Sequence, residues 1–346
     1  MRATIFEAPG KVTVVDKPVP IPGPGEIRLK TAATALCASD VRVYRGEKYA
    51  KPGVTPGHEL AGVVDMIGEG VTGISEGDRV VICPMVTCGK CRYCIVGRQN
   101  RCEQRKTMGY DLDGGFAEHV LIPADIVRVG HVLPVPKDLP LDLAAITEPT
   151  ACTLSSIELL GVRAGTSLAI MGAGPMGLLH VLLARAVGAG VIIVSEPVAE
   201  RREIAKRWGA DIVIDPTTQD AVAITKDATG GDGADAVALT IGSHAAVIPS
   251  FDLVRKQGTI NLFAGFPPKQ TVPFDPNFLH YNEVILTGSQ NATTDQYRRT
   301  IQMMKHVAHI DEVVTNRYDV EHGPQAYESR LSMSGLKSLV QFPGVE

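Results

Sequence analysis

The first 150 residues contain short stretches in which apolar and polar residues alternate, separated by clusters of glycine and proline. Alternation with a period of two is typical of strands that bury one face, and residues 27–31 and 61–67 are two examples. The clusters IPGPGE, KPGVTPG and GEGVTG are rich in residues that favour turns. This pattern predicts an antiparallel, barrel-like β domain.

Near residue 167 the pattern changes to short apolar runs that alternate with helical segments such as 178–189 and 200–210. This rhythm predicts a doubly wound, parallel α/β sheet. Its predicted strands are residues 167–171, 191–195, 211–215, 235–240 and 259–263. After about residue 288 a helix over residues 294–307 and further short strands follow, and we expect this tail to pack on the first domain.

Composition and charge narrow the possible functions. The chain of 346 residues is 45% apolar and 21% charged, as is usual for a globular protein. Its net charge of -4, with mixed signs and no basic block, argues against nucleic acid or an anionic membrane as a partner. The N-terminus lacks the apolar core of a signal peptide, and no apolar run approaches the roughly 20 residues of a membrane helix. We expect a cytoplasmic protein with reduced thiols that acts on a small soluble molecule.

Four cysteines form one short cluster with the spacing C-x2-C-x2-C-x7-C. They are Cys88, Cys91, Cys94 and Cys102. Thiolates at this spacing can converge on one tetrahedral ion, and four of them leave no open position for chemistry. The cluster therefore predicts a structural zinc lobe over residues 84–103. The alternative, unrelated thiols or disulfides, is weaker because disulfides are typical of short secreted chains.

A glycine motif, G-x-G-x-x-G, follows the predicted strand 167–171 and opens the next helix. Gly172 permits a tight turn, Gly174 lets the backbone approach a pyrophosphate, and Gly177 allows the helix to pack closely on the strand. This context predicts a dinucleotide site. The predicted cofactor-binding residues are Gly172, Gly174, Pro175, Met176, Gly177, Glu196 and Arg201.

The end of the next strand indicates which dinucleotide binds. Glu196 lies nineteen residues after Gly177, where a carboxylate can accept hydrogen bonds from the ribose hydroxyls and would repel a 2'-phosphate. NAD is therefore favoured over NADP. Arg201 and Arg202 are the competing detail because they could bind that phosphate, although they could also lie at a solvated helix start.

Four further residues that could bind a metal lie in three segments far apart in the chain. Cys37 occurs in ALCASD, His58 and Glu59 in PGHELAG, and Glu148 in AITEPTAC. A catalytic zinc usually takes three protein ligands from separate segments and keeps a fourth position open. Each residue also has an ordinary explanation, as a buried thiol, a hydrogen-bonded histidine or a surface carboxylate.

These motifs together resemble the zinc-containing medium-chain dehydrogenases, and most closely their sorbitol, polyol and threonine branch. The resemblance rests on GHE, CASD, the cysteine cluster and GAGPMG, and on DGGFAEHV, RWGAD and HYNEVILTGS, in the family order along essentially the whole chain. It implies a β-rich, GroES-like catalytic domain from residues 1–152 and 288–346, with an NAD-binding Rossmann domain inserted at 153–287. Such relatives form dimers or tetramers through Rossmann sheet edges, and the apolar strand 283–288 would permit this.

The resemblance also implies roles for individual residues. Cys37, His58 and Glu148 are expected to hold a catalytic zinc, so that each subunit binds two zinc ions. Glu59 is expected to bind this zinc intermittently. Ser39 is expected to pass the substrate proton towards the ribose, although a serine here could simply cap the following turn.

Two cysteines lie outside both predicted metal sites. Cys152 falls four positions after Glu148, and we expect it to line the nicotinamide pocket or to belong to a core rather than bind zinc. Cys83 is expected to be a buried structural thiol.

One position departs from the family pattern. Several relatives carry a histidine five residues after the zinc cysteine as the last proton acceptor, and Arg42 stands here. Arginine stays protonated and cannot be that base, so water or Glu59 would have to replace it. Arg42, Arg45 and Lys48 could attract an anionic group of the substrate, such as a sugar phosphate. A solvated loop is the simpler interpretation.

The sequence thus predicts a homo-oligomeric, zinc-dependent oxidoreductase that oxidises a secondary alcohol of a polyol, sugar or sugar phosphate with NAD. Oxidation of L-threonine at its β-carbon is the alternative within this class. A dinucleotide-binding protein without turnover is the alternative of another class, and the intact set Cys37, His58, Glu59 and Glu148 argues against it.

Overall fold

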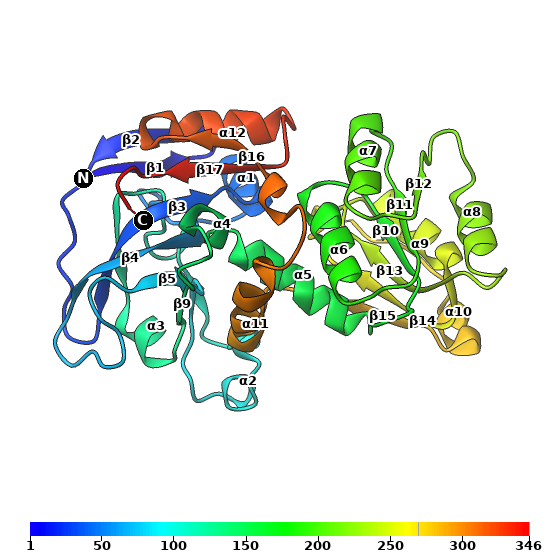
Figure 1. The fold of residues 1–346 in the computed structure, drawn as a ribbon, viewed down its shortest axis with the longest axis horizontal. Coiled ribbons are helices and arrows are strands. Elements are labelled where there is room, and N and C mark those ends of the chain that lie inside the picture. The colour runs from blue at the N-terminus through cyan, green and yellow to red at the C-terminus, as the bar shows by residue number, and fades with distance from the viewer. Residues whose placement is uncertain (269, 346) are drawn as a thin grey trace. The chain divides into compact units, whose positions relative to one another are not determined.

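The computed structural model describes residues 1–268 and 270–345, which form two compact units. The first unit contains Met1–Ala151, Ala292–His306 and the residues from Val314 onward, so both ends of the chain contribute to it. Strands are frequent in this unit, and in the other they alternate with helices (Figure 1).

The second unit contains Cys152–Asn291 and the short segment Val307–Val313. The sequence groups this short segment with the C-terminal tail of the first domain. In the structure its side chains contact the second unit instead. Trp208 stacks on His309 with ring centroids 6.4 Å apart, and Arg207 forms an ion pair with Glu312 at 2.6 Å.

A seven-stranded sheet is the framework of the first unit. Its longest pair consists of β3 (Ile27–Ala35) and β4 (Glu59–Ile67), which run antiparallel and include both stretches that the alternation predicts. The other strands are β5 (Arg79–Ile82), β8 (His119–Ile122), β9 (Val132–Pro134), β16 (Val314–Tyr318) and β17 (Lys337–Gln341).

The pair of β16 and β17 is parallel, unlike the other pairs of this sheet, which are antiparallel as predicted for the first 150 residues. The helix α12 (Gly323–Leu331) lies between these strands in the chain and provides the crossover that a parallel pair needs.

Short elements complete the first unit. The strands are β1 (Arg2–Ala8), β2 (Lys11–Asp16), β6 (Met85–Val86) and β7 (Lys106–Thr107). The helices are α1 (Ala38–Tyr44), α2 (Arg92–Ile95), η1 (Gln99–Arg101), α3 (Ala124–Arg128), α4 (Leu141–Ala144), α11 (Thr294–Met304) and η4 (Val320–His322).

The core of the first unit follows from the alternation along its strands. In the first half of β3, Ile27 and Leu29 are fully buried and alternate with the partly exposed Arg28 and Lys30, whereas residues 31–35 are all buried. Ile27 and Leu29 pack with Val80, Ile122 and Ile126. This packing holds β3 and β4 rigidly, and the ends of these two strands carry candidate site residues.

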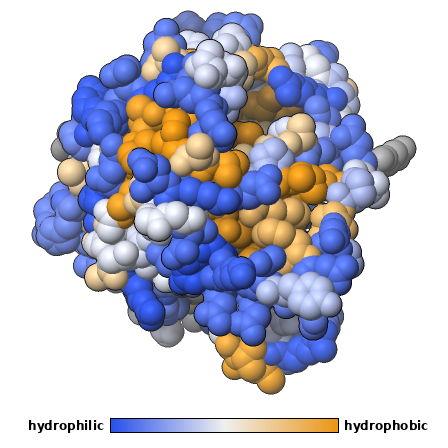
Figure 2. Space-filling view, turned by 90° about the vertical axis from the view of Figure 1, so that its right-hand side faces the viewer, coloured by the Kyte–Doolittle hydropathy of each residue, from blue (hydrophilic) through white to orange (hydrophobic). Residues whose placement is uncertain are grey.

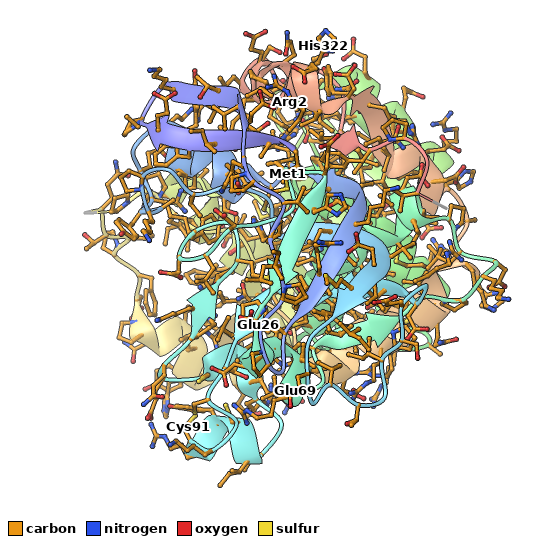
Figure 3. The ribbon with its side chains drawn as sticks, turned by 90° about the vertical axis from the view of Figure 1, so that its left-hand side faces the viewer. Met1, Arg2, Glu26, Glu69, Cys91 and His322 are labelled. Atoms are coloured by element: carbon orange, nitrogen blue, oxygen red, sulfur yellow. The ribbon has the colours of Figure 1, made fainter. Side chains whose placement is uncertain are left out.

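A charged pair joins the N-terminal strand to the C-terminal part of the first unit. The Arg2 guanidinium donates to Glu321 through Nε at 2.6 Å and through Nη2 at 2.7 Å. Arg2 and His322, the residue that follows Glu321, lie close together in Figure 3. The N-terminal strand is therefore tied to the segment that precedes α12.

The second unit contains a six-stranded, fully parallel sheet in the order β12-β11-β10-β13-β14-β15. The first five predicted strands correspond to β10–β14. The strands are β10 (Leu168–Met171), β11 (Ile192–Ser195), β12 (Ile212–Ile214), β13 (Ala234–Leu239), β14 (Val254–Leu262) and β15 (Ile285–Gly288). The order in which strands are added to the sheet reverses between β10 and β13, and dinucleotides bind at this position in sheets of this kind.

Helices connect these strands, and α5 (Thr147–Leu159) begins in the first unit and ends in the second. The others are α6 (Pro175–Ala186), α7 (Ala199–Arg207), α8 (Ala221–Ala228), η2 (His244–Ala246), α9 (Val247–Leu253), α10 (Pro276–Asn282) and η3 (Ile310–Val313). The predicted α/β architecture is confirmed.

Apolar residues on the surface occur in several patches among charged ones (Figure 2). Tyr281 and Ile285 are the most exposed large apolar residues of the second unit, and Ile285 begins the edge strand β15. Among the described helices, none has both the length and the apolar character to cross a membrane.

Candidate metal centres and dinucleotide site

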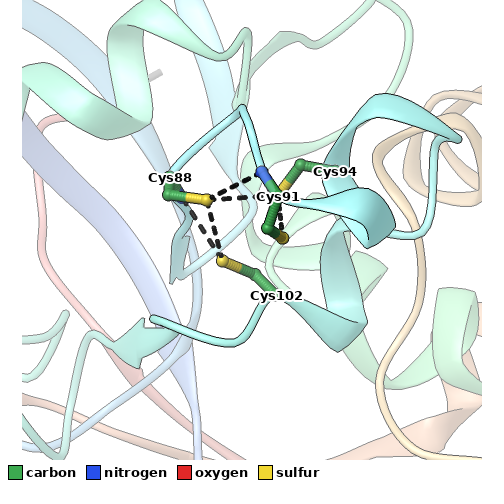
Figure 4. Close-up of side chains that lie close together, drawn as sticks. All are labelled: Cys88, Cys91, Cys94 and Cys102. Carbon is green, nitrogen blue, oxygen red and sulfur yellow. Dashed lines mark hydrogen bonds between the residues drawn. The ribbon is translucent and has the colours of Figure 1, made fainter.

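The four clustered cysteines converge in space, as Figure 4 shows. The sulfur of Cys88 lies 3.6 Å from that of Cys102 and 4.0 Å from that of Cys94, and the sulfurs of Cys91 and Cys94 are 3.6 Å apart. Four thiolates about 2.3 Å from one tetrahedral zinc ion would lie about 3.8 Å from each other. The lobe therefore has the dimensions of a zinc site, and its cysteines are free thiols rather than disulfides.

Backbone N–H groups favour the thiolate at part of this site. Hydrogen bonds from Glu103 and Cys94 lower the pKa of Cys91 to about 6, and those from Lys90 and Cys91 lower the pKa of Cys88. Burial raises the pKa of Cys94 to about 12. Cys94 thus depends most on a bound ion to become a thiolate.

A second group of possible metal ligands forms where β3 ends and β4 begins. Ala35 and Glu59 are opposite each other in the antiparallel register, so the residues just beyond them, Cys37 and His58, come together. The ligand atoms of Cys37, His58 and Glu59 all lie within 4.8 Å of one another. A thiolate, an imidazole and a carboxylate form a donor set that suits zinc and several other divalent ions.

His58 is oriented by a neighbouring carboxylate. Its Nδ1 lies 3.3 Å from Asp40 Oδ1, and neither atom has a well-formed hydrogen bond. Burial lowers the pKa of His58, but the charges of Asp40 and Cys37 outweigh burial and raise it well above the usual value. With Nδ1 directed at Asp40, Nε2 is the nitrogen that remains for a metal ion.

Glu59 lies beside a cation that the sequence analysis missed. Lys337 Nζ donates to its two carboxylate oxygens at 2.7 and 2.5 Å, and also to the carbonyl of Leu36 at 3.2 Å. Both side chains are buried. A buried carboxylate requires such a partner, and the lysine limits the freedom of Glu59 to reach a metal. The sequence signal for this pair was a lysine at the start of β17, but the residues near it do not identify its partner.

Glu148 lies in the first turn of α5 and is buried. It is outside the group of three ligand residues with mutual distances within 4.8 Å. Burial is the largest cause of the raised pKa of Glu59, and the charge of Glu148 raises this pKa further. The same charge also raises the pKa of Lys48 and of Tyr110. Glu148 therefore lies near the group without completing it.

Ser39 has a partner that the sequence analysis also missed. The hydroxyls of Ser39 and Tyr110 are 2.6 Å apart, and the Tyr110 hydroxyl lies 3.5 Å from His58 Nε2. Burial, followed by the charges of Asp40 and Cys37, raises the pKa of Tyr110 well above its usual value. The phenol is thus protonated and can donate to Ser39 Oγ.

The glycine turn of the second unit has the features that a pyrophosphate site needs. Gly172 has φ +99°, and an added Cβ would lie 2.5 Å from Ile241. A Cβ at Gly177 would meet the carbonyl of Gly172 at 1.8 Å, so only glycine fits. An added Cβ at Gly174 meets nothing within 4 Å, so there is room beside the N-terminus of α6.

Glu196 lies against this turn. Its Oε2 accepts from the N–H of Ala173 at 2.6 Å, and its Oε1 accepts from Val198 at 3.0 Å. Arg202 donates to the carbonyl of Glu196 at 2.7 Å and pairs with Asp215 at 3.1 Å, so its guanidinium is engaged in the fold. Among the described residues, Arg201 forms no ion pair or side-chain hydrogen bond.

Comparison with known proteins agrees with both units. Residues 23–136 match the model of the alcohol dehydrogenase GroES-like domain, and residues 175–306 match that of the zinc-binding dehydrogenases. L-Threonine 3-dehydrogenase from Pyrococcus horikoshii is 35% identical over 311 residues, covering 88% of this chain and 87% of that protein. Sorbitol dehydrogenase from Bacillus subtilis is 31% identical and covers 98% and 97%.

The chain belongs to the zinc-containing, alcohol dehydrogenase-like medium-chain family. A solved structure from Sinorhizobium meliloti with bound NADP superimposes on this dehydrogenase with a TM-score of 0.92, at 31% identity, and covers 99% of each chain. The resemblance seen in the sequence is thereby confirmed, and the protein is an oxidoreductase.

In this dehydrogenase the described thiols outside the two ligand groups differ in environment. Cys83 is fully buried, and burial raises the pKa of its thiol to about 12, which makes it unreactive. Cys152 is partly exposed near the start of the second unit and is absent from both ligand groups.

Proposed function

We propose that this dehydrogenase oxidises a secondary alcohol of a polyol, sugar or sugar phosphate to a ketone, with hydride transfer to NAD. The observation that carries the proposal is the convergence of Cys37, His58 and Glu59 next to the Ser39 hydroxyl. A donor set of mixed type beside a proton-accepting hydroxyl suits an alcohol substrate, whereas the closed cysteine lobe does not.

Cys37, His58 and Glu148 are the residues that we propose hold the catalytic zinc. Zinc bound there would lower the pKa of an alcohol hydroxyl by several units. Glu59, held by Lys337, is the residue that approaches the metal when the ligands rearrange. The four lobe cysteines hold the second, structural zinc.

Side chains and glycines of this chain would transfer the alcohol proton and bind the dinucleotide. Ser39 would relay the proton of the alcohol, because its Oγ can accept that proton while its own hydroxyl proton moves on towards the ribose of the cofactor. Tyr110 keeps the Ser39 hydroxyl oriented through their short hydrogen bond. In the second unit, Gly172, Gly174 and Gly177 position the pyrophosphate, with Pro175 and Met176 at the start of α6. Hydride transfer requires the nicotinamide to reach the carbinol carbon.

NAD is the proposed acceptor because Glu196 places a carboxylate beside the glycine turn, where it disfavours a 2'-phosphate. The NADP in the Sinorhizobium meliloti structure makes NADP the competing cofactor, and Arg201 is the residue that could receive its phosphate. Comparison of kcat/KM for NAD and NADP, in the wild type and in Arg201→Ala, decides between them.

L-Threonine is the second candidate substrate. The observation that favours it is the higher identity to the Pyrococcus horikoshii threonine dehydrogenase than to the Bacillus subtilis sorbitol dehydrogenase. Both reactions use the same zinc and dinucleotide chemistry, so the candidates differ only in the substrate pocket.

Two further features are proposals of the same kind. The exposed edge strand β15, with Ile285 at its start, supports a dimer or tetramer built on this edge. Seven free cysteines suit a reducing compartment such as the cytoplasm.

The test is formation of NADH with a panel of polyols, sugar phosphates and L-threonine, measured before and after removal of zinc by a chelator. We expect turnover that disappears on chelation and returns with zinc. Absence of NADH formation with every substrate, or full activity after complete zinc removal, would contradict the proposal.

A further inference from the structure

Lys48 lies on the loop after α1, and its ammonium group points into the candidate catalytic site. Lys48 Nζ lies 3.6 Å from the centre of the Tyr110 ring. The hydroxyl of the same ring lies 2.6 Å from Ser39 and 3.5 Å from His58. One aromatic ring therefore separates the ammonium from the residues that we assign to the reacting hydroxyl.

The three cations of this loop have different surroundings. Arg42 lies 3.6 Å from Glu47, so its charge has a local partner. Arg45 is exposed. Lys48 is exposed as a whole residue. Within the described part of the chain its ammonium has no hydrogen-bond acceptor and no carboxylate within ion-pair distance. The Lys48 ammonium instead lies over the face of the Tyr110 ring, and this cation–π contact is weaker than a contact with an anion.

The charges around Lys48 indicate what kind of group could bind it. Burial of the ammonium lowers the pKa of Lys48, and Arg105 lowers it further. The negative charges of Cys37, Asp40 and Glu148 raise it. Zinc held by Cys37 and Glu148 would offset the charges of these two residues, whereas Asp40 would keep its negative charge beside a neutral, metal-bound His58. Lys48 and Arg105 then leave an excess of positive charge at this side.

We propose that Lys48 binds an anionic group of the substrate, a carboxylate or a phosphate, and so makes this dehydrogenase selective for short secondary alcohols that carry a negative charge. This inference rests on the proposed function and names its substrate class. The anionic group lies within a few bonds of the reacting carbon, because only the ring of Tyr110 separates Lys48 from Ser39.

Matched pairs of alcohols that differ only in the anionic group provide the test. The pairs are 3-hydroxybutyrate with 2-butanol, L-threonine with 1-amino-2-propanol, and glycerol 3-phosphate with glycerol. For each pair the ratio of kcat/KM between the alcohol with the anionic group and the alcohol without it measures the selectivity. The first two pairs report on a carboxylate and the third reports on a phosphate.

We expect the wild type to prefer the charged member of at least one pair, and Lys48→Gln to lower that ratio by about 10- to 100-fold. The member without the anionic group should react almost equally with both enzymes. Lys48→Arg keeps the charge and should retain part of the selectivity. Arg45→Gln is the control variant, because it removes the same charge from the same loop without touching Tyr110, and it should leave the ratio unchanged.

Calorimetric titration of the zinc-loaded and NADH-loaded protein with the same compounds gives a second readout that needs no turnover. Lys48→Gln should weaken binding of the charged compound by a similar factor. If Lys48→Gln binds the compounds with and without the anionic group as the wild type does, the inference is overturned. A larger effect of Arg45→Gln than of Lys48→Gln would also overturn it. Absence of NADH formation together with Lys48-dependent binding would instead refute the proposed function alone.

Discussion

The two candidate metal centres of this dehydrogenase are built in opposite ways. The cysteine lobe takes all four sulfurs from residues 88–102, with little help from the rest of the chain. The candidate catalytic group takes Cys37, His58 and Glu59 from the paired strands β3 and β4 and the residues beside them, and its Glu59 is held by Lys337, which lies 278 residues further along the chain. A local centre is thus specified by spacing, and a dispersed one by the register of a sheet and by buried charge pairs.

The strongest way to break the dispersed centre is Lys337→Met. Glu59 would then be a buried carboxylate without its cation, and we expect the free energy of unfolding to fall by about 3–5 kcal/mol. Guanidinium unfolding measures the loss. The double variant Lys337→Met with Glu59→Gln removes both charges and should recover most of it.

The same variant makes a prediction on pH. Burial raises the pKa of Glu59 and Lys337 lowers it, so removal of Lys337 lets this pKa rise further. Below the raised pKa the carboxyl group is neutral and costs less to bury, so the stability deficit should shrink as the pH falls from neutral to mildly acidic values. A deficit that grows on acidification would show that the charge pair is not its cause.

Cys91→Ser breaks the local centre. It should remove about one zinc equivalent and, for an ion present at about 100 times its dissociation constant, about 3 kcal/mol of stability. Zinc at Cys37 and His58 should stay. Elemental analysis measures the zinc content, and thermal unfolding measures the stability. Cys152→Ser, which lies outside both ligand groups, is the matched control. Loss of catalytic rather than lobe zinc would reverse our assignment.

Glu148→Ala sharpens the question of the third catalytic ligand. The structure places Glu148 near the group but not within it. We expect affinity for the catalytic zinc to fall by roughly 10- to 100-fold, with the lobe zinc and the unfolding temperature almost unchanged. Zinc titration against a competing chelator measures the change. Unaltered affinity would mean that Glu59 or another group is the ligand.

The smallest expected effect is that of Tyr110→Phe, which removes only the hydroxyl that contacts Ser39. One net hydrogen bond corresponds to a decrease of kcat by about 2- to 10-fold. Ser39→Ala should cost more, because it removes the proton-accepting hydroxyl itself. Equal activity of wild type and Tyr110→Phe would show that the short hydrogen bond does not orient Ser39.

The sequence predicts best what depends on neighbouring residues. The spacing of the cysteines and the glycines Gly172 and Gly177 identify their local geometry, and the apolar runs identify β10–β14. The parallel pairing of β16 with β17 was not predicted, because short alternating strands carry no signal of direction.

Tyr110 and Lys337 were missed for a different reason. Their partners Ser39 and Glu59 are 71 and 278 residues away. A single sequence does not show which distant side chains will come into contact. Arg42, Arg45 and Lys48 look equivalent in the sequence. Only the structure shows that Lys48 alone lies on Tyr110.

Diffraction from crystals at the zinc absorption edge would locate both metal ions. We expect two anomalous peaks in each chain, one among the four lobe sulfurs and one between the Cys37 sulfur and His58 Nε2. A peak in the lobe alone, from crystals grown with zinc present, would contradict the assignment of a catalytic metal to Cys37 and His58.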